Sequence, residues 1–280
     1  MRILSWKICG QLAGLAQRQI DAVLERAPDV LALQEVSAGN YSEWCAALMG
    51  AGYSIASAID LTGVPYPDMS PPIRRRYFNL TATRGALAPL KGLRYEDPEQ
   101  AAVAFPEKYL AAAVLLDGTA VEIHNADVPP SETLGLIKVH ALQAIRRRVD
   151  ESPERPLVLC GDFMTPRAED EDGMRTWAGT HASYDDEWDA AERSILEHPV
   201  LRDVYRERHQ PGTPFPVSKY TRGTGHRYDH IYASPELETV SCAYLRQWLS
   251  EKLSDHAPVE AELRPAPEGG SGRDEEDGEA

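Results

Sequence analysis

Residues 254–259 read Ser-Asp-His-Ala-Pro-Val, and residues 161–163 read Gly-Asp-Phe. The first stretch leads into an apolar run and the second closes one, and short apolar runs with polar borders are typical of buried strands. Asp162, Asp255 and His256 therefore stand where expected strands meet the surface of the core. Acidic and imidazole side chains at such positions are candidates for one shared site.

Carboxylates stand at the ends of other expected strands as well. Glu35 follows the apolar run 30–33, Asp127 follows the strand 121–125, and Asp229 opens another strand. Hard cations such as Mg²⁺ prefer oxygen ligands of this kind. A single acid at a turn is common, but several acids that emerge together from a core predict a common site.

The rest of the chain alternates expected strands with helices and hairpins. Apolar residues recur at helical spacing in 20–27, 41–49 and 131–145. The segments 109–116 and 120–125 predict a hairpin across an Asp-Gly turn. This mixture favours a β-sandwich flanked by helices over a purely parallel wound sheet.

Composition excludes several classes of protein. The 280 residues hold 29 Lys and Arg against 44 Asp and Glu, a formal net charge of −15, whereas proteins that coat nucleic acid or anionic membranes are basic. No stretch approaches the roughly 18 apolar residues of a membrane span, and the first residues lack the apolar core of a signal peptide. We expect a cytoplasmic monomer without a membrane partner. The four cysteines are widely spaced, which predicts reduced thiols rather than zinc ligands.

Two segments are markedly acidic. Residues 165–189 hold eight acids and two arginines and predict a solvated insertion beside the site. Residues 265–280 hold six acids and one arginine among Gly and Pro, which predicts a disordered tail. Residues 1–264 are then a single folded domain, with a net charge of −10 once the −5 of the tail is set aside.

Six blocks of sequence occur in one order along the chain. They are Arg-Ile-Leu-Ser-Trp at 2–6, Leu-Gln-Glu-Val at 33–36, Asn-Ala-Asp-Val-Pro at 125–129, Gly-Asp-Phe at 161–163, Arg-Tyr-Asp-His-Ile-Tyr-Ala-Ser at 227–234 and Ser-Asp-His-Ala-Pro-Val at 254–259. In these blocks, residues 1–264 resemble the endonuclease/exonuclease/phosphatase superfamily, the group of deoxyribonuclease I, exonuclease III and the inositol-phosphate phosphatases. The resemblance implies a four-layer α/β sandwich, with two mixed β-sheets packed face to face, flanking helices, and the site at one edge of both sheets.

The resemblance also implies a role for each retained site residue. Glu35 would bind a divalent metal, Mg²⁺ or Mn²⁺, with Asp255 as a second ligand. Asp162 would orient or deprotonate the attacking water, and His256 would contact the scissile phosphate. Asp229 would hydrogen-bond His256, fix its tautomer and favour the imidazolium.

Three positions depart from the family pattern, all in the implied site. Lys7 stands where the family has Asn, and its ammonium would compete with a cation near Glu35. Asp127 stands where the family has Tyr or His, and an ionised Asp repels phosphate. Met164 replaces an Asn whose amide helps to position water and phosphate.

Three functions are consistent with this sequence. The first is a metal-dependent phosphoester hydrolase, either a phosphodiesterase or nuclease or a small-molecule phosphatase. The second is a repurposed, metal-independent enzyme of the same fold that acts on an unusual small substrate through Lys7 and Asp127. These two residues pair with each other, or Lys7 occupies part of the place of the metal and binds an anionic group directly. The third is a non-catalytic binding protein, although the retained Asp162 and His256 argue against complete decay.

Several polar residues near the motifs are candidates for binding the substrate. They are Asn125, Arg84, Arg222 and Arg227. Arg74–Arg76 form one basic cluster, and Lys219 lies with Arg222 and Arg227 in a second, although a solvated rim is the alternative interpretation. Because duplex-cleaving enzymes need basic loops over the grooves, the acidity of this chain favours a small phosphorylated molecule or nucleotide over long nucleic acid.

Overall fold

Two β-sheets form the centre of the molecule. The computed structural model describes residues 1–9, 14–61, 77–92, 105–116, 118–130, 136–152, 156–170, 173–176, 185–209, 217–221 and 224–267. The arginine cluster at 74–76 and the acidic residues from 268 onward lie outside these ranges.

The first sheet has six strands in the order β13-β14-β1-β2-β4-β3. In that order they are β13 (Leu237–Tyr244), β14 (Val259–Pro265), β1 (Arg2–Lys7), β2 (Val30–Ser37), β4 (Tyr77–Thr83) and β3 (Ser54–Ser57). β1 therefore lies inside the sheet, antiparallel to β14 and parallel to β2.

The second sheet has eight strands, six of them in the order β10-β12-β8-β7-β6-β5. They are β10 (Arg202–Asp203), β12 (Thr224–Ala233), β8 (Leu157–Asp170), β7 (Thr119–Asp127), β6 (Tyr109–Leu116) and β5 (Ala86–Gly92), with β11 (Lys219–Thr221) paired to β12 and β9 (Gly173–Thr176) paired to β8. The expected hairpin is present as β6 and β7.

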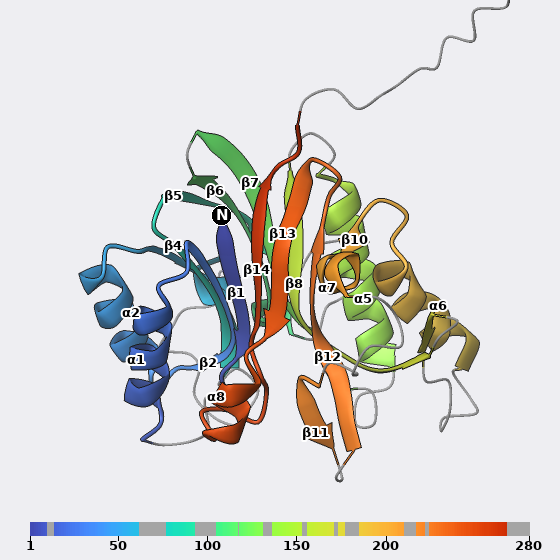
Figure 1. Cartoon of the computed structure of the whole chain (residues 1–280), viewed down its shortest axis with the longest axis horizontal. Helices are drawn as coiled ribbons and strands as arrows, with labels where there is room; N and C mark the ends of the chain where they lie inside the picture. Colours follow the sequence, from blue (N-terminus) through green and yellow to red (C-terminus); the bar gives the residue numbers. More distant parts are fainter. Residues whose placement is uncertain are drawn as a thin grey trace, which may run out of the picture.

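Helices cover the outer face of each sheet, so the molecule has four layers (Figure 1). α1 (Ala16–Arg26) and α2 (Tyr41–Gly50) pack on the first sheet, and α5 (Leu136–Asp150) and α6 (Asp185–Leu196) pack on the second. A third apolar core fills the space between the sheets. The remaining short elements are α3 (Ala58–Leu61), α7 (Val204–Arg208), α8 (Arg246–Ser250) and a 3₁₀ turn at Pro106–Lys108.

Side-chain alternation along β1 decides what reaches the space between the sheets. Ile3 lies between the sheets, whereas Leu4 and Trp6 face α1 and α2. Because side chains on a strand alternate with period two, Lys7 points to the inner side at the last residue of the strand.

The carboxyl ends of parallel strands meet Lys7 at the same edge, at the bottom of the view in Figure 1. Lys7 is opposite Gln34 in the parallel pair of β1 and β2, and Asp127 is opposite Asp162 in the parallel pair of β7 and β8. β12 runs antiparallel to β8 and places Asp229 opposite Asp162. Strand pairing within each sheet and the face-to-face packing of the two sheets thus bring these charged side chains together.

Two backbone irregularities shape this edge. β2 is bulged at Glu35, whose φ is 58°, and this left-handed conformation turns its side chain away from the outer face that alternation predicts. Gly161 has φ 137°, and a Cβ there would lie 1.8 Å from the carbonyl oxygen of Ala126. Only glycine therefore lets β8 run this close to β7 directly before Asp162.

The four-layer sandwich expected from the sequence is confirmed, with two corrections of detail. The 165–189 segment is not simply a loop, because β8 continues to Asp170, β9 pairs with it, and α6 begins at Asp185. β14 extends to Pro265, one residue past the expected domain boundary. None of the helices in the described part of the chain is long and apolar enough to cross a membrane.

Candidate active site

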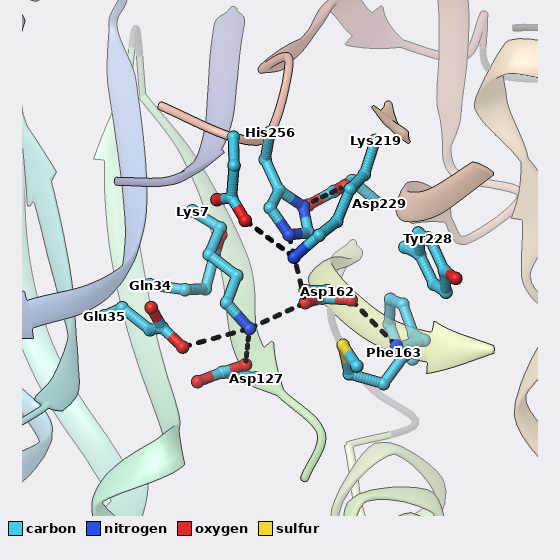
Figure 2. A network of polar contacts seen from close by, with 12 residues as sticks. Lys7, Gln34, Glu35, Asp127, Asp162, Phe163, Lys219, Tyr228, Asp229 and His256 are labelled. Carbon is cyan, nitrogen blue, oxygen red and sulfur yellow. Dashed lines mark hydrogen bonds and ion pairs between the residues drawn. The ribbon is translucent and has the colours of Figure 1, made fainter. Parts of the chain in front are cut away.

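The Lys7 ammonium lies at the centre of the site, among three carboxylates (Figure 2). Its Nζ is 2.8 Å from Asp162 Oδ2, 3.0 Å from Asp127 Oδ1 and 3.2 Å from Glu35 Oε1. The ammonium donates hydrogen bonds to Asp127 and Asp162 and forms an ion pair with Glu35. The pair between Lys7 and Asp127 that the sequence raised as one possibility is therefore present, with two further acids.

Lys7 is held in its charged form. Burial alone would lower the pKa of Lys7, but the attraction of Asp127, Asp162 and Glu35 raises this pKa well above its ordinary value. The Lys7 side chain is only 9% exposed, so water screens these ion pairs weakly. A lysine that keeps its proton is neither a base nor a nucleophile, and its contribution to the site is a fixed positive charge.

A second ammonium, from Lys108, contacts the other oxygen of Asp127. Burial disfavours the charged carboxylate, yet Lys108 and Lys7 together lower the pKa of Asp127 to about 2. Sequence reasoning did not single out Lys108, which ends the 3₁₀ turn before β6. The register of the expected hairpin could have identified it. Tyr109 pairs with Ala126 in this antiparallel pair, so the preceding residue, Lys108, lies beside Asp127.

His256 and Asp229 form a buried pair next to this cluster. His256 Nδ1 is 2.8 Å from Asp229 Oδ2, and both residues are almost fully buried. Burial disfavours the imidazolium, but the Asp229 carboxylate raises the pKa of His256 above its ordinary value. Within the described part of the chain, His256 Nε2 has no hydrogen-bond partner and lies 3.9 Å from Asp162 Oδ2.

Asp162 links the lysine cluster to the histidine. Its Oδ2 accepts from Lys7, and its Oδ1 accepts from the backbone N–H of Met164 at 2.8 Å. A carboxylate has about four acceptor positions, so two remain for water or a substrate. Met164 has φ 49°, and its carbonyl accepts a hydrogen bond from the buried Lys138 Nζ at 3.0 Å.

Asp255, implied as a metal ligand, contacts a different residue. Its Oδ2 is 2.7 Å from Lys219 Nζ, and its side chain is 49% exposed. Asp255 therefore binds an ammonium in this structure, and its role as a metal ligand stays a prediction. Lys219, which the sequence places in a basic cluster with Arg222 and Arg227, contacts a residue of the site motifs.

Asn125 joins the two sheets and does not face a substrate. Its Nδ2 donates to the carbonyl oxygens of Leu33 at 3.1 Å and Leu80 at 3.0 Å, and its Oδ1 accepts from Gln34 Nε2 at 2.8 Å. The residue is fully buried. The substrate-binding prediction for Asn125 is wrong, because its amide is consumed by contacts between β7 and the first sheet.

Arg227 is also wrong as a substrate-binding candidate. It is fully buried, with Nη1 2.8 Å from Asp203 Oδ2 and Nη2 2.5 Å from Asp203 Oδ1. Its guanidinium lies over the rings of Tyr205 and Tyr244. A fully buried guanidinium that binds Asp203 and contacts two tyrosine rings acts in the core rather than on a ligand.

Arg84 lies at the opposite end of the first sheet from Lys7. It follows Thr83, which pairs with Val30 at the start of β2, and its Nε donates to the hydroxyl of Tyr53 at 3.2 Å. Its proposed role in the site is therefore wrong. Arg222, the remaining candidate, lies outside the described residues.

A family model described as "Endonuclease/Exonuclease/phosphatase family" matches residues 4–256. The chain belongs to the endonuclease/exonuclease/phosphatase family. This is a family of phosphoester hydrolases, and the match runs from β1 through His256, so it includes every residue placed in the site above.

Solved structures of this family share the fold at low sequence identity. An AP endonuclease from Archaeoglobus fulgidus is similar with a TM-score of 0.66 and 18% identity over 94% of this chain and 99% of that chain. The 3′ phosphatase NExo from Neisseria, bound to a product DNA hairpin, has a TM-score of 0.65 and 22% identity, over 94% of this chain and 99% of that chain. Humanized D. rerio TDP2 has a TM-score of 0.64 and 15% identity, over 94% of this chain and 98% of that chain.

Members of the endonuclease/exonuclease/phosphatase family are typically metal-dependent, but the residues here do not fit a divalent ion. Three carboxylate oxygens converge on one point, as they would around Mg²⁺ or Mn²⁺, and Lys7 Nζ occupies that point. The oxygens lie 2.8–3.2 Å from it, whereas Mg²⁺ binds oxygen at about 2.0–2.1 Å. Across the described ranges, no group of three or more His, Cys, Asp or Glu side chains is arranged to hold a metal.

Proposed function

We propose that this chain hydrolyses a phosphodiester bond in a small molecule or nucleotide without a divalent ion at Glu35. One observation carries the proposal: the Lys7 ammonium lies 2.8–3.2 Å from three carboxylates, while the His256–Asp229 pair beside it is intact. The charge of Lys7 offsets acids that would otherwise repel an anionic substrate. Since two hydrogen bonds and an ion pair hold the ammonium among carboxylates, Lys7 positions and neutralises the site and does not touch the phosphate.

The chemical step uses Asp162 and His256. Water attacks phosphorus and gives one proton to Asp162, the bond from phosphorus to the leaving oxygen breaks, and solvent protonates that oxygen. His256 Nε2–H donates to a non-bridging phosphoryl oxygen, where charge builds up. The 3.9 Å between His256 Nε2 and Asp162 Oδ2 suits groups that act on neighbouring oxygens, and it is too short for the attacking and leaving oxygens on opposite sides of phosphorus.

Charge at the site favours a singly charged substrate. The carboxylates are Glu35, Asp127, Asp162, Asp229 and Asp255, and the cations are Lys7, Lys108, Lys219 and protonated His256. One net negative charge remains, so a diester monoanion is repelled less than a monoester dianion. The −10 of residues 1–264 likewise favours a small substrate over long nucleic acid.

Turnover of synthetic esters in the presence of EDTA tests the proposal. We expect bis(p-nitrophenyl) phosphate to be hydrolysed at a rate that EDTA leaves unchanged, and p-nitrophenyl phosphate to be hydrolysed more slowly. His256→Ala and Asp162→Asn should each lower kcat by about 100-fold or more. His209→Ala is the matched control, because His209 contacts the Cys242 carbonyl away from this edge. Activity that EDTA abolishes contradicts the proposal. If neither ester is hydrolysed, the result favours a non-catalytic binding protein.

Lys7→Asn tests the role of the ammonium directly. The shorter amide vacates the point where three carboxylate oxygens converge, so we expect Mn²⁺ to bind the variant and not the wild type, measured by electron paramagnetic resonance. Adding Glu35→Gln to Lys7→Asn should weaken that binding. Wild-type protein that binds Mn²⁺ as tightly as the variant contradicts the assignment of Lys7 as the resident cation.

A further inference from the structure

We propose that Lys219 and His256 together form the anion site that holds the two non-bridging oxygens of the phosphodiester, with Asp255 as the residue that positions Lys219. The inference rests on the proposed function and names the contacts of its substrate. Lys219 enters the site from β11, a strand that pairs only with β12 among the described strands.

The backbone around Lys219 is tied to the strands that carry the histidine pair. The carbonyl of Ser218 accepts from the N–H of Ala257 at 2.7 Å. The hydroxyl of Ser218 accepts from the N–H groups of Tyr228 and Asp229 at 2.9 and 3.2 Å. Ser218 is fully buried. Lys219 therefore starts from a fixed point between the neighbours of His256 and Asp229.

The Lys219 ammonium has donors to spare. Within the described residues its ion-pair partner is Asp255 at 2.7 Å, which uses one of three N–H groups. The Lys219 side chain is 25% exposed and that of Asp255 49%, so the pair is solvated and weak, and rearranging it for a ligand costs little. The pKa of Lys219 rises despite burial because of Asp255, and the charge of Lys219 interacts with those of Asp162 and Lys7.

His256 supplies the second and independent observation. Its Nε2 is fully buried and without a hydrogen-bond partner in the described residues, although its Nδ1 is bound to Asp229. A buried polar atom without a partner is costly, and in a site of this kind it marks the place of a ligand. Figure 2 shows the imidazole and the Lys219 side chain on the same side of Asp162.

The chemistry of a diester matches these two donors. Its single charge is shared by two non-bridging oxygens, one for His256 Nε2–H and one for Lys219 Nζ. Asp162, 3.9 Å from His256 Nε2, then stands beside the bound phosphorus with acceptor positions left for water.

Binding of diethyl phosphate, followed by ³¹P NMR, tests the proposal without turnover. We expect Lys219→Met to weaken binding by about 10- to 100-fold, the effect of one charge-assisted hydrogen bond, while Lys219→Arg retains most of the affinity. Asp255→Asn should weaken binding less than Lys219→Met, because the lysine remains. Arg264→Met is the matched control, because Arg264 is an exposed cation paired with the Glu238 carboxylate at the end of the first sheet opposite Lys7, and this change should alter the affinity little.

The outcomes separate this proposal from the proposed function. Wild-type protein that does not bind diethyl phosphate, or Lys219→Met that binds it as well as the wild type, overturns the anion site. Binding that depends on Lys219 in a protein without turnover supports the anion site and rejects the hydrolase. A circular dichroism spectrum that matches the wild type shows that each variant is folded. If Lys219→Met does not fold, the affinity of Lys219→Arg for diethyl phosphate tests the proposal instead.

Discussion

Replacing Lys7 by Met should destabilise the protein by about 3–5 kcal/mol near neutral pH, the cost of stranding buried charge. Asp162 and Asp127 have side chains 0% and 1% exposed, so water does not compensate them when the ammonium is removed. Methionine restores most of the volume but no donor. Asp127 still contacts Lys108, and Asp162 still accepts from the N–H of Met164. The loss of stability is therefore smaller than the sum of the energies of the separate ion pairs of Lys7.

The loss depends on pH, and its sign follows from the carboxylates. In the wild type, Lys108 and Lys7 lower the folded-state pKa of Asp127 to about 2 from 3.8, so this stabilisation is complete above about pH 4 and is lost as the pH falls toward 2. In Lys7→Met, Asp127 loses one of the two ammonium groups that lower its pKa, so this pKa lies higher than in the wild type. Acidification then costs the variant less stability than the wild type, and the difference in stability between them shrinks as the pH falls.

Urea unfolding at about pH 7.5 and about pH 5, followed by fluorescence and circular dichroism, measures both effects. Lys138→Met is the matched control, since Lys138 is fully buried but contacts a single carboxylate, Glu192. The loss of stability caused by Lys138→Met should depend less on pH than the loss caused by Lys7→Met. A loss below about 1 kcal/mol for Lys7→Met, or a loss that grows on acidification, refutes the view that Lys7 neutralises a buried acid cluster.

Three further changes probe neighbouring features. Asp229→Asn removes the charge that raises the pKa of His256, so the alkaline limb of kcat/KM against pH should move to lower pH; an unmoved limb means that another group titrates. Met164→Asn should raise the free energy of unfolding by about 0.5–1 kcal/mol, because Asn tolerates the left-handed φ of 49° better, and a lower value shows that the thioether packs usefully. Arg227→Met should lower the free energy of unfolding by about 3–5 kcal/mol, because it leaves the Asp203 carboxylate without its partner, while KM stays constant. A raised KM would show that Arg227 binds the substrate.

The resemblance of six sequence blocks to a family predicts the four-layer architecture and the site, and strand periodicity agrees with where the charged side chains lie. The alternation of Ile3, Leu4 and Trp6 already places Lys7 on the inner face, and apolar runs that end in Asp127 and Asp162 set two carboxylates at one edge. These signals are local, since they need only strand periodicity and strand ends.

Polar residues within strands were misassigned because periodicity gives the face and not the depth. Asn125 precedes Asp127 by two positions on the same face of β7, and this step moves it from the edge of the sandwich into the middle. There an amide must find partners on the opposing sheet. Arg227 likewise lies on a motif strand, but its partner Asp203 is in an element that no motif marks.

Partners of the site lysines depend on contacts between distant elements. Lys219 reaches Asp255 because β11 pairs with β12 and Ser218 binds Ala257. No local pattern encodes those contacts. The bulge that turns Glu35 inward is equally invisible in the sequence, because Glu is not a residue that favours a φ of 58°.

The position of β1 between β14 and β2 ties two distant parts of the sequence together. Lys7 contacts Asp162, 155 positions away, and the Ser254 hydroxyl donates to the Lys7 carbonyl, 247 positions away. A folding intermediate that has paired β1 with β2 but not yet with β14 exposes one edge of β1, and exposed strand edges promote aggregation. Aggregation of variants that destabilise β14 should therefore start at the free edge of β1.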